Sequence, residues 1–157
     1  MFSLIAAIGK NNELGKNNQL IFHIKEDMKF FRNTTKDHKV VMGRNTWKSL
    51  PGKLPNRINI VVSETPITEA DLTIQELAPF IQKNKGTDEE IFIIGGGMIY
   101  REFLNHAKNL YLTEIDNEDP AADTFFPTFD KSKYTKEIIK KGSENGLNYT
   151  FAKYIKK

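Results

Sequence analysis

The sequence predicts an α/β protein whose central sheet is mostly parallel, with flanking helices and an antiparallel hairpin at the C-terminal end. Three observations carry this prediction. Short apolar runs recur along the first two thirds of the chain, amphipathic segments lie between several of them, and two strand-like segments surround a glycine-containing turn near the end. Alternating strands and helices are typical of parallel sheets. The length of 157 residues suits one domain, which we expect to span residues 1–157.

The expected elements can be placed in order. The apolar runs that predict strands are Phe2–Ile8, Lys39–Met42, Ile58–Val62, Ile91–Ile94 and Leu110–Ile115. The segments with helical periodicity are Lys25–Asn33, Arg44–Leu50, Thr73–Lys83 and Met98–Asn105. The terminal hairpin should pair Tyr134–Lys140 with Tyr149–Ile155 around a turn at Gly142–Gly146. Two further loops, Gly9–Gln19 and the acidic Asp116–Phe126, are long enough to carry function.

Composition narrows the classes of function. The net charge of +3 is too small, and the lysines are too scattered, to indicate a nucleic-acid partner. The absence of cysteine excludes disulfides and thiolate chemistry, and it favours a cytoplasmic location. The apolar start Phe2–Ile8 is too short to span a membrane and lacks the basic flank of a signal peptide. The three histidines show no metal-ligand spacing, so we expect no metal site.

Two strand-to-helix junctions have the composition of anion sites. Three glycines, Gly95–Gly97, follow a buried strand and remove every Cβ where the chain turns into a helix. Backbone N–H groups at such a helix start can approach a phosphate closely, and the helix dipole favours its charge. Gly43, followed by Arg44 and Thr46, repeats this arrangement. The alternative is a pair of tight turns that bind no ligand. Two such junctions in one small domain favour a cofactor with a pyrophosphate group.

Asp27 lies at the margin of an amphipathic helix. A helical wheel places it beside Phe31 at the edge of the apolar face, away from the basic residues Lys25, Lys29 and Arg32. A buried carboxylate there needs a polar partner, and burial raises its pKa and fits it for proton handling or for binding an amidine-like cation. A solvated acid in the first helical turn would only interact with the dipole. The periodicity does not decide between the two.

Arg57 follows a turn that contains two prolines and precedes the strand Ile58–Val62. An arginine fixed in this way can clamp a carboxylate, because the guanidinium fork matches the two carboxylate oxygens. The alternative is an arginine at the rim of a site, in contact with water only.

Taken in order, these residues resemble dihydrofolate reductases from Met1 to about Phe126, and more weakly through the terminal hairpin. The segments that carry the resemblance are Ser3–Ala7, Asp27 with Phe31, Val41–Arg44 with Thr46-Trp47, Leu54-Pro55 with Arg57–Asn59, Ile94–Gly97, Tyr111–Thr113, Asp123-Thr124 and Phe126-Pro127. The resemblance implies a monomeric enzyme that reduces 7,8-dihydrofolate to 5,6,7,8-tetrahydrofolate with NADPH. Hydride would pass to C6 of the pterin while N5 takes a proton from solvent.

The resemblance also implies which residues form the site. Asp27, supported by Thr113, would hydrogen-bond the 2-amino group and N3 of the pterin, and Arg57 would hold the glutamate α-carboxylate. Asp27, Thr113 and Phe22 are the expected catalytic residues. The expected substrate-binding residues are Ile5, Ala6, Ala7, Asp27, Met28, Phe31, Leu50, Leu54, Arg57, Ile94, Tyr100 and Thr113. The expected cofactor-binding residues are Ala7, Ile8, Leu14, Gly15, Asn18, Gln19, Leu20, Gly43, Arg44, Asn45, Thr46, Val62, Ser63, Glu64, Ile94, Gly95, Gly96, Gly97, Met98, Ile99 and Tyr100. A cis bond is expected between Gly95 and Gly96, and the Gly9–Ile24 loop should close over the nicotinamide.

The chain departs from the family pattern in several places. Ile21-Phe22 stands where Pro-Trp is usual, so an indole N–H near the pterin is missing. Glu64 stands where a small hydroxyl residue is common, and Glu76 and Met98 replace frequent basic residues near the cofactor phosphates. An acid beside the adenosine ribose is the arrangement that NAD sites use, so the preference for NADPH should be reduced. The acidic loop contains Pro120-Ala121-Ala122 and lacks glycine before Asp123, so its dynamics should also differ.

Two other functions stay open at the level of sequence. One is a related reductase that acts on the ribosylaminopyrimidine of riboflavin synthesis. Asp27 together with Arg57 favours folate over this substrate, because a glutamate tail needs a carboxylate clamp. The other is a module that binds folate or a nucleotide without turnover.

Overall fold

Eight strands form one sheet in the computed structural model, which describes residues 1–157. The strands lie in the order β10-β11-β8-β1-β7-β4-β5-β6. Their bounds are β1 Phe2–Ile8, β4 Lys39–Gly43, β5 Ile58–Val62, β6 Leu72–Ile74, β7 Ile91–Gly95, β8 Ala107–Ile115, β10 Tyr134–Glu144 and β11 Leu147–Lys156. Neighbours from β8 to β6 are parallel, whereas β11 is antiparallel to both β8 and β10. The predicted α/β class with a C-terminal antiparallel pair is confirmed.

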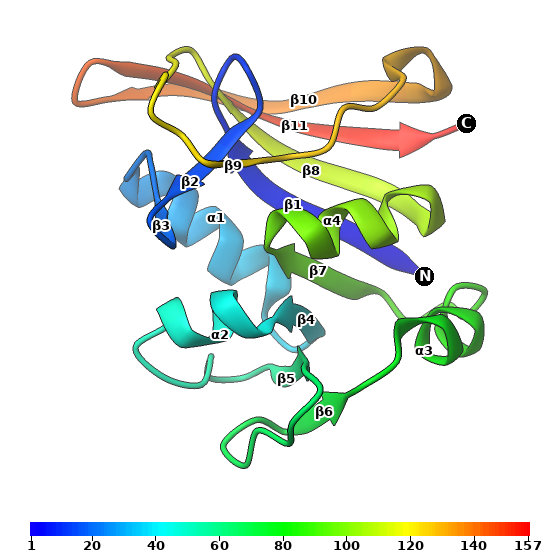
Figure 1. The fold of residues 1–157 in the computed structure, drawn as a ribbon. Helices are drawn as coiled ribbons and strands as arrows, with labels where there is room; N and C mark the ends of the chain where they lie inside the picture. Colours follow the sequence, from blue (N-terminus) through cyan, green and yellow to red (C-terminus); the bar gives the residue numbers. More distant parts are fainter.

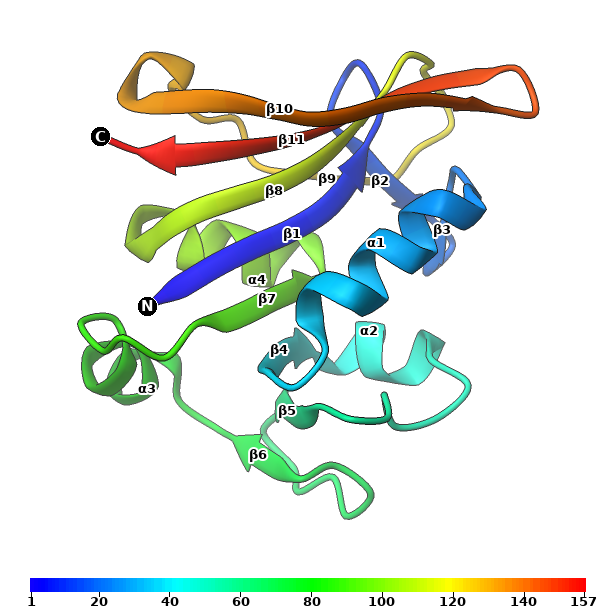
Figure 2. The ribbon, with the colours of Figure 1, turned by 180° about the vertical axis from the view of Figure 1, so that it is seen from behind.

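Helices cover both faces of this sheet. They are α1 Lys25–Thr35, α2 Arg44–Ser49, α3 Leu77–Asn84 and α4 Gly97–Phe103. Helix α4 lies in front of the strands in Figure 1, and α1 lies in front of them in Figure 2, which is seen from behind. Phe2 of β1 packs in the cluster that includes Phe103 of α4, whereas Phe92 of the neighbouring strand β7 packs in a second cluster, against Phe30 of α1. Strands buried on both faces explain the continuous apolar runs in the sequence.

The predicted helix over Thr73–Lys83 is wrong in its first part. Leu72–Ile74 forms the edge strand β6, which pairs in parallel with β5, and α3 begins only at Leu77. The β-branched residues Thr73 and Ile74 favour an extended edge strand over a helix. Pro79 fits the first turn of α3, where its missing N–H has no intrahelical partner to lose.

The hairpin turn is shorter than the sequence predicts. Strand β10 continues to Glu144, and the turn consists of Asn145 and Gly146, both with positive φ (51° and 79°). Two such residues suit a tight hairpin turn. Gly142 stays within β10 because the Tyr149 ring occupies the space of a side chain there. A Cβ on Gly142 would lie 2.5 Å from Cζ of Tyr149.

The two long loops contain short strands that the sequence did not predict. Strand β2, Glu13–Lys16, pairs with β3, Gln19–Leu20, and with β9, Thr124–Phe125. This three-stranded sheet joins the first loop to the acidic loop across more than 100 positions of sequence. None of the helices is long and apolar enough to cross a lipid bilayer.

Candidate active site

Many of the expected site residues gather at one edge of the sheet, whereas Leu54 and Arg57 precede the opposite end of β5. Strands β1, β4, β5, β7 and β8 run in the same direction, so their carboxyl ends meet at the same edge. The residues at or next to these ends are Ala7 and Ile8 of β1, Gly43 of β4, Val62 of β5, Ile94 and Gly95 of β7 and Thr113 of β8. Ligands of open α/β sheets bind beyond this edge, so the fold brings these residues to the place where a cofactor and substrate can meet.

Asp27 is the carboxylate at this edge. It lies in the first turn of α1, and Oγ1 of Thr113 donates a hydrogen bond of 2.6 Å to its Oδ1. Thr113 itself is only 2% exposed. Burial raises the pKa of Asp27 above its ordinary value, and the hydrogen bond from Thr113 opposes that rise. Asp27 is therefore a half-buried acid with a polar partner, which is closer to the first of the two possibilities that the periodicity left open.

Tyr100 closes the site from the side of α4. Its hydroxyl donates a 2.7 Å hydrogen bond to the backbone oxygen of Ile5, in the middle of β1. Burial raises the pKa of the Tyr100 phenol, and the nearby charge of Asp27 raises it further. The phenol therefore stays protonated and serves as a fixed donor that ties α4 to β1.

The glycine junction between β7 and α4 is a tight, side-chain-free turn. The Gly95–Gly96 peptide bond is cis, and Gly95 has a φ of +127°, a conformation open to glycine but rarely to other residues. A Cβ built on Gly96 would meet only Oγ1 of Thr46, at 3.6 Å. Gly43 at the start of α2 approaches Ile99 of α4, where a Cβ would lie 3.1 Å from Cγ1. The two junctions that the sequence singled out therefore lie side by side.

A dinucleotide fits the residues around these junctions. Peptide N–H groups at the starts of α2 and α4 have no intrahelical partners, and the glycines let an anion approach them. Thr46 adds a hydroxyl between the junctions, and Arg44 is exposed and in no ion pair. The donors offered to a pyrophosphate therefore come from both helix starts.

The turn after β5 differs from what the sequence led us to expect. Ser63 is only 7% exposed, and its Oγ accepts a 3.2 Å hydrogen bond from the backbone N–H of Thr65. Glu64 and Thr65 are both exposed. Thr65, which sequence reasoning missed, is thus the more accessible hydroxyl of this turn. The sequence does contain a signal for Thr65, namely a second hydroxyl residue two positions after Ser63.

Arg57 is held in place without an acidic partner. Its Nε donates to the backbone oxygen of Pro55 at 2.9 Å, its Nη1 donates to Oγ1 of Thr35 at 3.2 Å, and its guanidinium lies 5.9 Å from the Phe31 ring centre. Burial lowers the pKa of Arg57, and the neighbouring charge of Arg32 lowers it further. Neither arginine is in an ion pair. An arginine whose guanidinium is held in place and has no acidic side-chain partner suits a carboxylate ligand, and the charge of Arg32 adds to the attraction. The wheel had placed Arg32 on the polar face, which gave no sign that its charge would act on Arg57.

The expected apolar walls are open to solvent to different degrees. Met28 and Met98 are 58% and 69% exposed, and Leu20 is also exposed. The half-buried residues among the expected wall and contact positions are Ala6, Ala7, Phe31, Leu50, Leu54 and Ile94, while Ile5, Ile8, Leu14 and Ile99 are buried. Phe22 is half-buried and packs against the cluster of Ile24, Ile115, Tyr149 and Phe151. Phe22 has no polar atom with which to order water.

A polar hollow at the other end of β8 is a poorer candidate. Its volume is about 270 Å³, and its lining includes His106, Lys108 and Lys156. Ala107 is the only apolar residue that lines it. Since small-molecule sites are mostly apolar with a few placed polar groups, this hollow does not suit a pterin.

Comparison with known proteins identifies the family of this chain. The family model described as dihydrofolate reductase matches residues 1–156. The chain belongs to the dihydrofolate reductase family. The dihydrofolate reductase of Bacillus subtilis (strain 168) is 36% identical over 162 residues, which cover 100% of this chain and 95% of the relative. That of Buchnera aphidicola subsp. Acyrthosiphon pisum is 38% identical over 154 residues, or 95% of each chain. The dihydrofolate reductase type 3 of Salmonella typhimurium is 42% identical over 132 residues, or 82% of this chain and 80% of the relative.

Membership of the dihydrofolate reductase family gives the geometry its chemical meaning. The family uses NADPH, which the paired glycine junctions fit. The cis bond between Gly95 and Gly96, expected from the resemblance, is present. The full-length relatives are reductases, so neither the riboflavin-type reductase nor the non-catalytic module is retained.

Proposed function

We propose that the chain reduces 7,8-dihydrofolate to 5,6,7,8-tetrahydrofolate with NADPH, and that Asp27 and Arg57 divide the recognition of the substrate. The observation that carries this proposal is the Asp27 carboxylate, which is half-buried at the carboxyl edge of the sheet and accepts a hydrogen bond from Thr113. At the far end of α1 from Asp27, Arg32 belongs to the last turn and Arg57 contacts Thr35, and neither pairs with an acidic side chain. One acid and two bases at opposite ends of one helix match a ligand with a basic head and an acidic tail.

Asp27 acts on the pterin head by charge and hydrogen bonding. Its two oxygens accept hydrogen bonds from the 2-amino group and N3, while Thr113 fixes the orientation of the carboxylate. Because the carboxylate is poorly solvated, its charge is weakly screened and stabilises positive charge that develops on the pterin at N5. The proton itself comes from solvent, since Asp27 needs only to raise the affinity of N5 for it.

The arginine pair acts on the substrate tail. The Nε and Nη1 groups of Arg57 are already bonded to Pro55 and Thr35, which sets the plane of the guanidinium before substrate arrives. Its remaining donors can hold the glutamate α-carboxylate, and the charge of Arg32 adds to the attraction. Binding energy from this distant contact positions the reacting head.

The cofactor is held by the two glycine junctions. Bound NADPH supplies the hydride for C6. The proposed phosphate-binding residues are Gly43, Arg44, Asn45 and Thr46 at the start of α2 and Gly95, Gly96, Gly97, Met98 and Ile99 at the start of α4. In the turn after β5, Thr65 joins Ser63 as a donor for the adenosine 2′-phosphate.

The β2–β3 hairpin excludes water from the reacting groups. Nδ2 of Asn18 donates a 3.0 Å hydrogen bond to the backbone oxygen of Asn45, so the hairpin already reaches the cofactor side of the site. Leu14, Gly15, Gln19 and Leu20 belong to this hairpin. Exclusion of bulk water strengthens the charge effect of Asp27.

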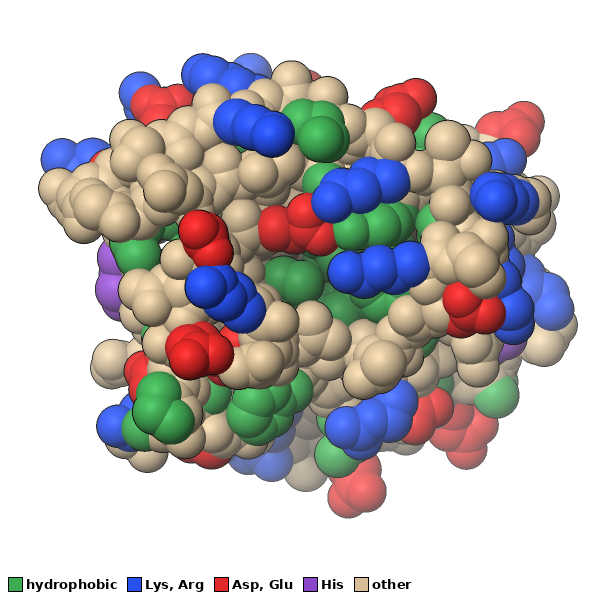
Figure 3. All heavy atoms as spheres, turned by 90° about the horizontal axis from the view of Figure 1, so that it is seen from above, with side chains coloured by type: hydrophobic (Ala, Val, Ile, Leu, Met, Phe, Trp, Pro, Cys, Tyr) green, Lys and Arg blue, Asp and Glu red, His purple; other side chains and the backbone are tan.

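A monomeric, cytoplasmic enzyme is part of this proposal. The edge strand β10 is exposed along nearly its whole length and carries Lys136, Lys140 and Lys141, which discourage pairing with a second sheet. Figure 3 shows basic side chains spread over the face that looks out from the β10–β11 hairpin. Sedimentation at several protein concentrations tests the monomer, and the cysteine-free composition supports the location.

The test is a product analysis with labelled cofactor. NADPH that carries deuterium at the transferred position is mixed with 7,8-dihydrofolate and the enzyme, and the product is examined by mass spectrometry and NMR. We expect one deuterium at C6 and unlabelled hydrogen at N5 after exchange with water. Absence of dihydrofolate-dependent NADPH oxidation, or label elsewhere than C6, would overturn the proposal.

A further inference from the structure

Glu13 is the one charged side chain that is fully buried in this protein. It is 2% exposed, and no lysine, arginine or histidine pairs with it. Its Oε1 accepts a 2.7 Å hydrogen bond from the backbone N–H of Asn11, and its Oε2 accepts one of 2.8 Å from the backbone N–H of Asp119. Since a buried carboxylate is costly without such partners, its presence in β2 calls for a reason.

Gly9 leaves room for this carboxylate. A Cβ on Gly9 would lie 2.5 Å from Oε1 of Glu13 and 2.9 Å from the backbone oxygen of Asn117. Any other residue at position 9 would displace the carboxylate or the acidic loop. Because Gly9 has no Cβ, the Glu13 carboxylate has room to lie beside it and to accept the hydrogen bond from Asp119.

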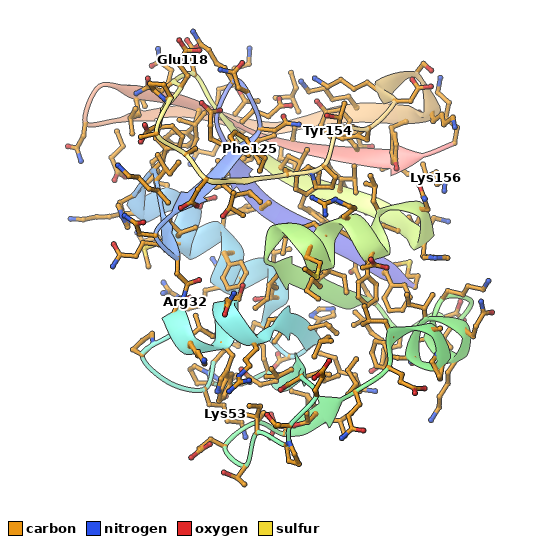
Figure 4. All side chains as sticks on the ribbon, in the orientation of Figure 1. Arg32, Lys53, Glu118, Phe125, Tyr154 and Lys156 are labelled. Atoms are coloured by element: carbon orange, nitrogen blue, oxygen red, sulfur yellow. The ribbon has the colours of Figure 1, made fainter.

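The carboxylate joins two loops that are more than 100 residues apart in sequence. Around it, the N–H of Lys10 donates to the oxygen of Asn117 at 2.9 Å, and Nδ2 of Asn11 donates to Oε2 of Glu118 at 3.0 Å. We call the contact of residues 9–13 with residues 116–119 the clasp. Figure 1 shows the two loops side by side, and Figure 4 shows Glu118 at their outer end and Phe125 nearer to α4. Glu13 is the buried member of the clasp, whereas Glu118 is exposed.

The clasp continues into strands that touch both glycine junctions. Glu13 pairs with Phe125 in the β2–β9 ladder. The backbone oxygen of Phe125 and Cγ2 of Thr124 lie 3.1 and 3.2 Å from the place of a Cβ on Gly97, at the start of α4. From the other end of β2, Asn18 reaches the start of α2 through its hydrogen bond to Asn45. The position of β2 therefore determines how closely β9 packs on the start of α4 and whether Asn18 reaches the start of α2.

We propose that Glu13 is a positioning residue for NADPH. Its carboxylate fixes β2 against the acidic loop, and β2 and β9 in turn hold the starts of α2 and α4 in the arrangement that receives the cofactor phosphates. The inference rests on the proposed cofactor site. It states that Glu13, which lies outside that site, contributes to the affinity for NADPH. Dihydrofolate, bound mainly through α1 and Arg57, should depend on Glu13 far less.

The test compares Glu13→Gln with Glu118→Gln. In the first variant, the amide nitrogen faces a backbone N–H and one hydrogen bond is lost; in the second, the exposed amide still accepts from Asn11. We expect Glu13→Gln to raise the Kd and KM for NADPH about 10-fold and to change the KM for dihydrofolate by less than about 2-fold. Glu118→Gln should leave all three close to those of the unchanged enzyme.

Gly9→Ala provides a second route to the same displacement and keeps the test valid if Glu13→Gln does not fold. It should reproduce the selective loss of NADPH affinity, and the double variant should lose little more than either single one. Equal losses for both ligands, or a lower melting temperature with unchanged NADPH affinity, would reduce Glu13 to a structural role. Failure of the unchanged enzyme to bind NADPH would instead overturn the proposed function.

Discussion

At the scale of single residues, Asp27 is governed by its burial and by the hydrogen bond that it accepts from Thr113 of β8. The sequence shows that Asp27 lies at the margin of an amphipathic helix. Its exposure to solvent depends on β8, because Thr113, 86 positions further along the chain, donates a hydrogen bond to it. The hydrogen bond from Thr113 shows that Asp27 is a half-buried acid with a polar partner and not a fully solvated one. Thr65 and Arg32 escaped notice for the same reason, since only the fold shows that Ser63 is mostly buried and that the charge of Arg32 acts on Arg57.

Burial of Asp27 predicts a pH-dependent stability difference for Asp27→Asn. The folded pKa of Asp27 lies above its ordinary 3.8, so its contribution to stability is fully present below that pH and is lost as the pH rises through the folded pKa. Asparagine can still accept from Thr113 and never ionises. We expect the free energy of unfolding of the variant, relative to the unchanged protein, to improve between about pH 4 and about pH 7. Urea unfolding at both pH values measures it, and a difference that is independent of pH would contradict the account.

Arg57 predicts a loss that depends on the tail of the ligand. Arg57→Leu should weaken the binding of folates by about 2–4 kcal/mol, roughly 30- to 1,000-fold in Kd, because a desolvated bidentate pair is lost. Pterins without the glutamate tail should bind almost as before. Arg57→Lys keeps the charge without the fork and should lie between. Titration calorimetry with both ligand types decides the matter, and equal losses for the two would make Arg57 a rim residue.

At the scale of elements, strongly periodic segments were predictable and edges were not. The buried runs of β1, β5 and β7 have the expected bounds to within one residue, because burial on both faces leaves an unbroken apolar signal. Strand β6 was taken for helix because an edge strand buries little and leaves a weak pattern. The strands β2 and β9 pair with each other across the fold, so nothing local in their sequences reveals them.

The turn between β5 and β6 predicts a weakened cofactor preference. Glu64 is exposed beside Thr65, and its charge should repel the 2′-phosphate of NADPH but not the hydroxyl of NADH. We expect NADPH to be preferred by about 1–3 kcal/mol, roughly 5- to 150-fold in kcat/KM. Glu64→Ser should widen this ratio by lowering the KM for NADPH alone.

Glu69 provides the matched control for this prediction, because it is an exposed acid in the same loop. Glu69→Ser should leave the ratio of the two kcat/KM values unchanged. Equal efficiency of the unchanged enzyme with NADPH and NADH would contradict the preference, and a Glu64→Ser variant with both KM values unchanged would show that Glu64 points away from the ribose.

At the scale of the whole molecule, the parallel order of β8, β1, β7, β4 and β5 is what turns scattered residues into one site. It places the α1 carboxylate and both glycine junctions at one edge, while Arg57 lies at the other end of α1, where it contacts Thr35. The class of fold and this common edge followed from the sequence. The closure of the site by β2 and β9 did not, since it depends on long-range contacts such as those of Glu13.

The pH dependence of dihydrofolate-linked NADPH oxidation, measured for the unchanged enzyme and for Asp27→Asn, tests the central claim most directly. If the buried Asp27 charge promotes protonation of N5, the variant should lose about 10²-fold or more in rate near pH 7 while keeping its fold. The loss should shrink in acid, where N5 gains its proton unaided. A variant that is almost as active as the unchanged enzyme near pH 7 would contradict the account.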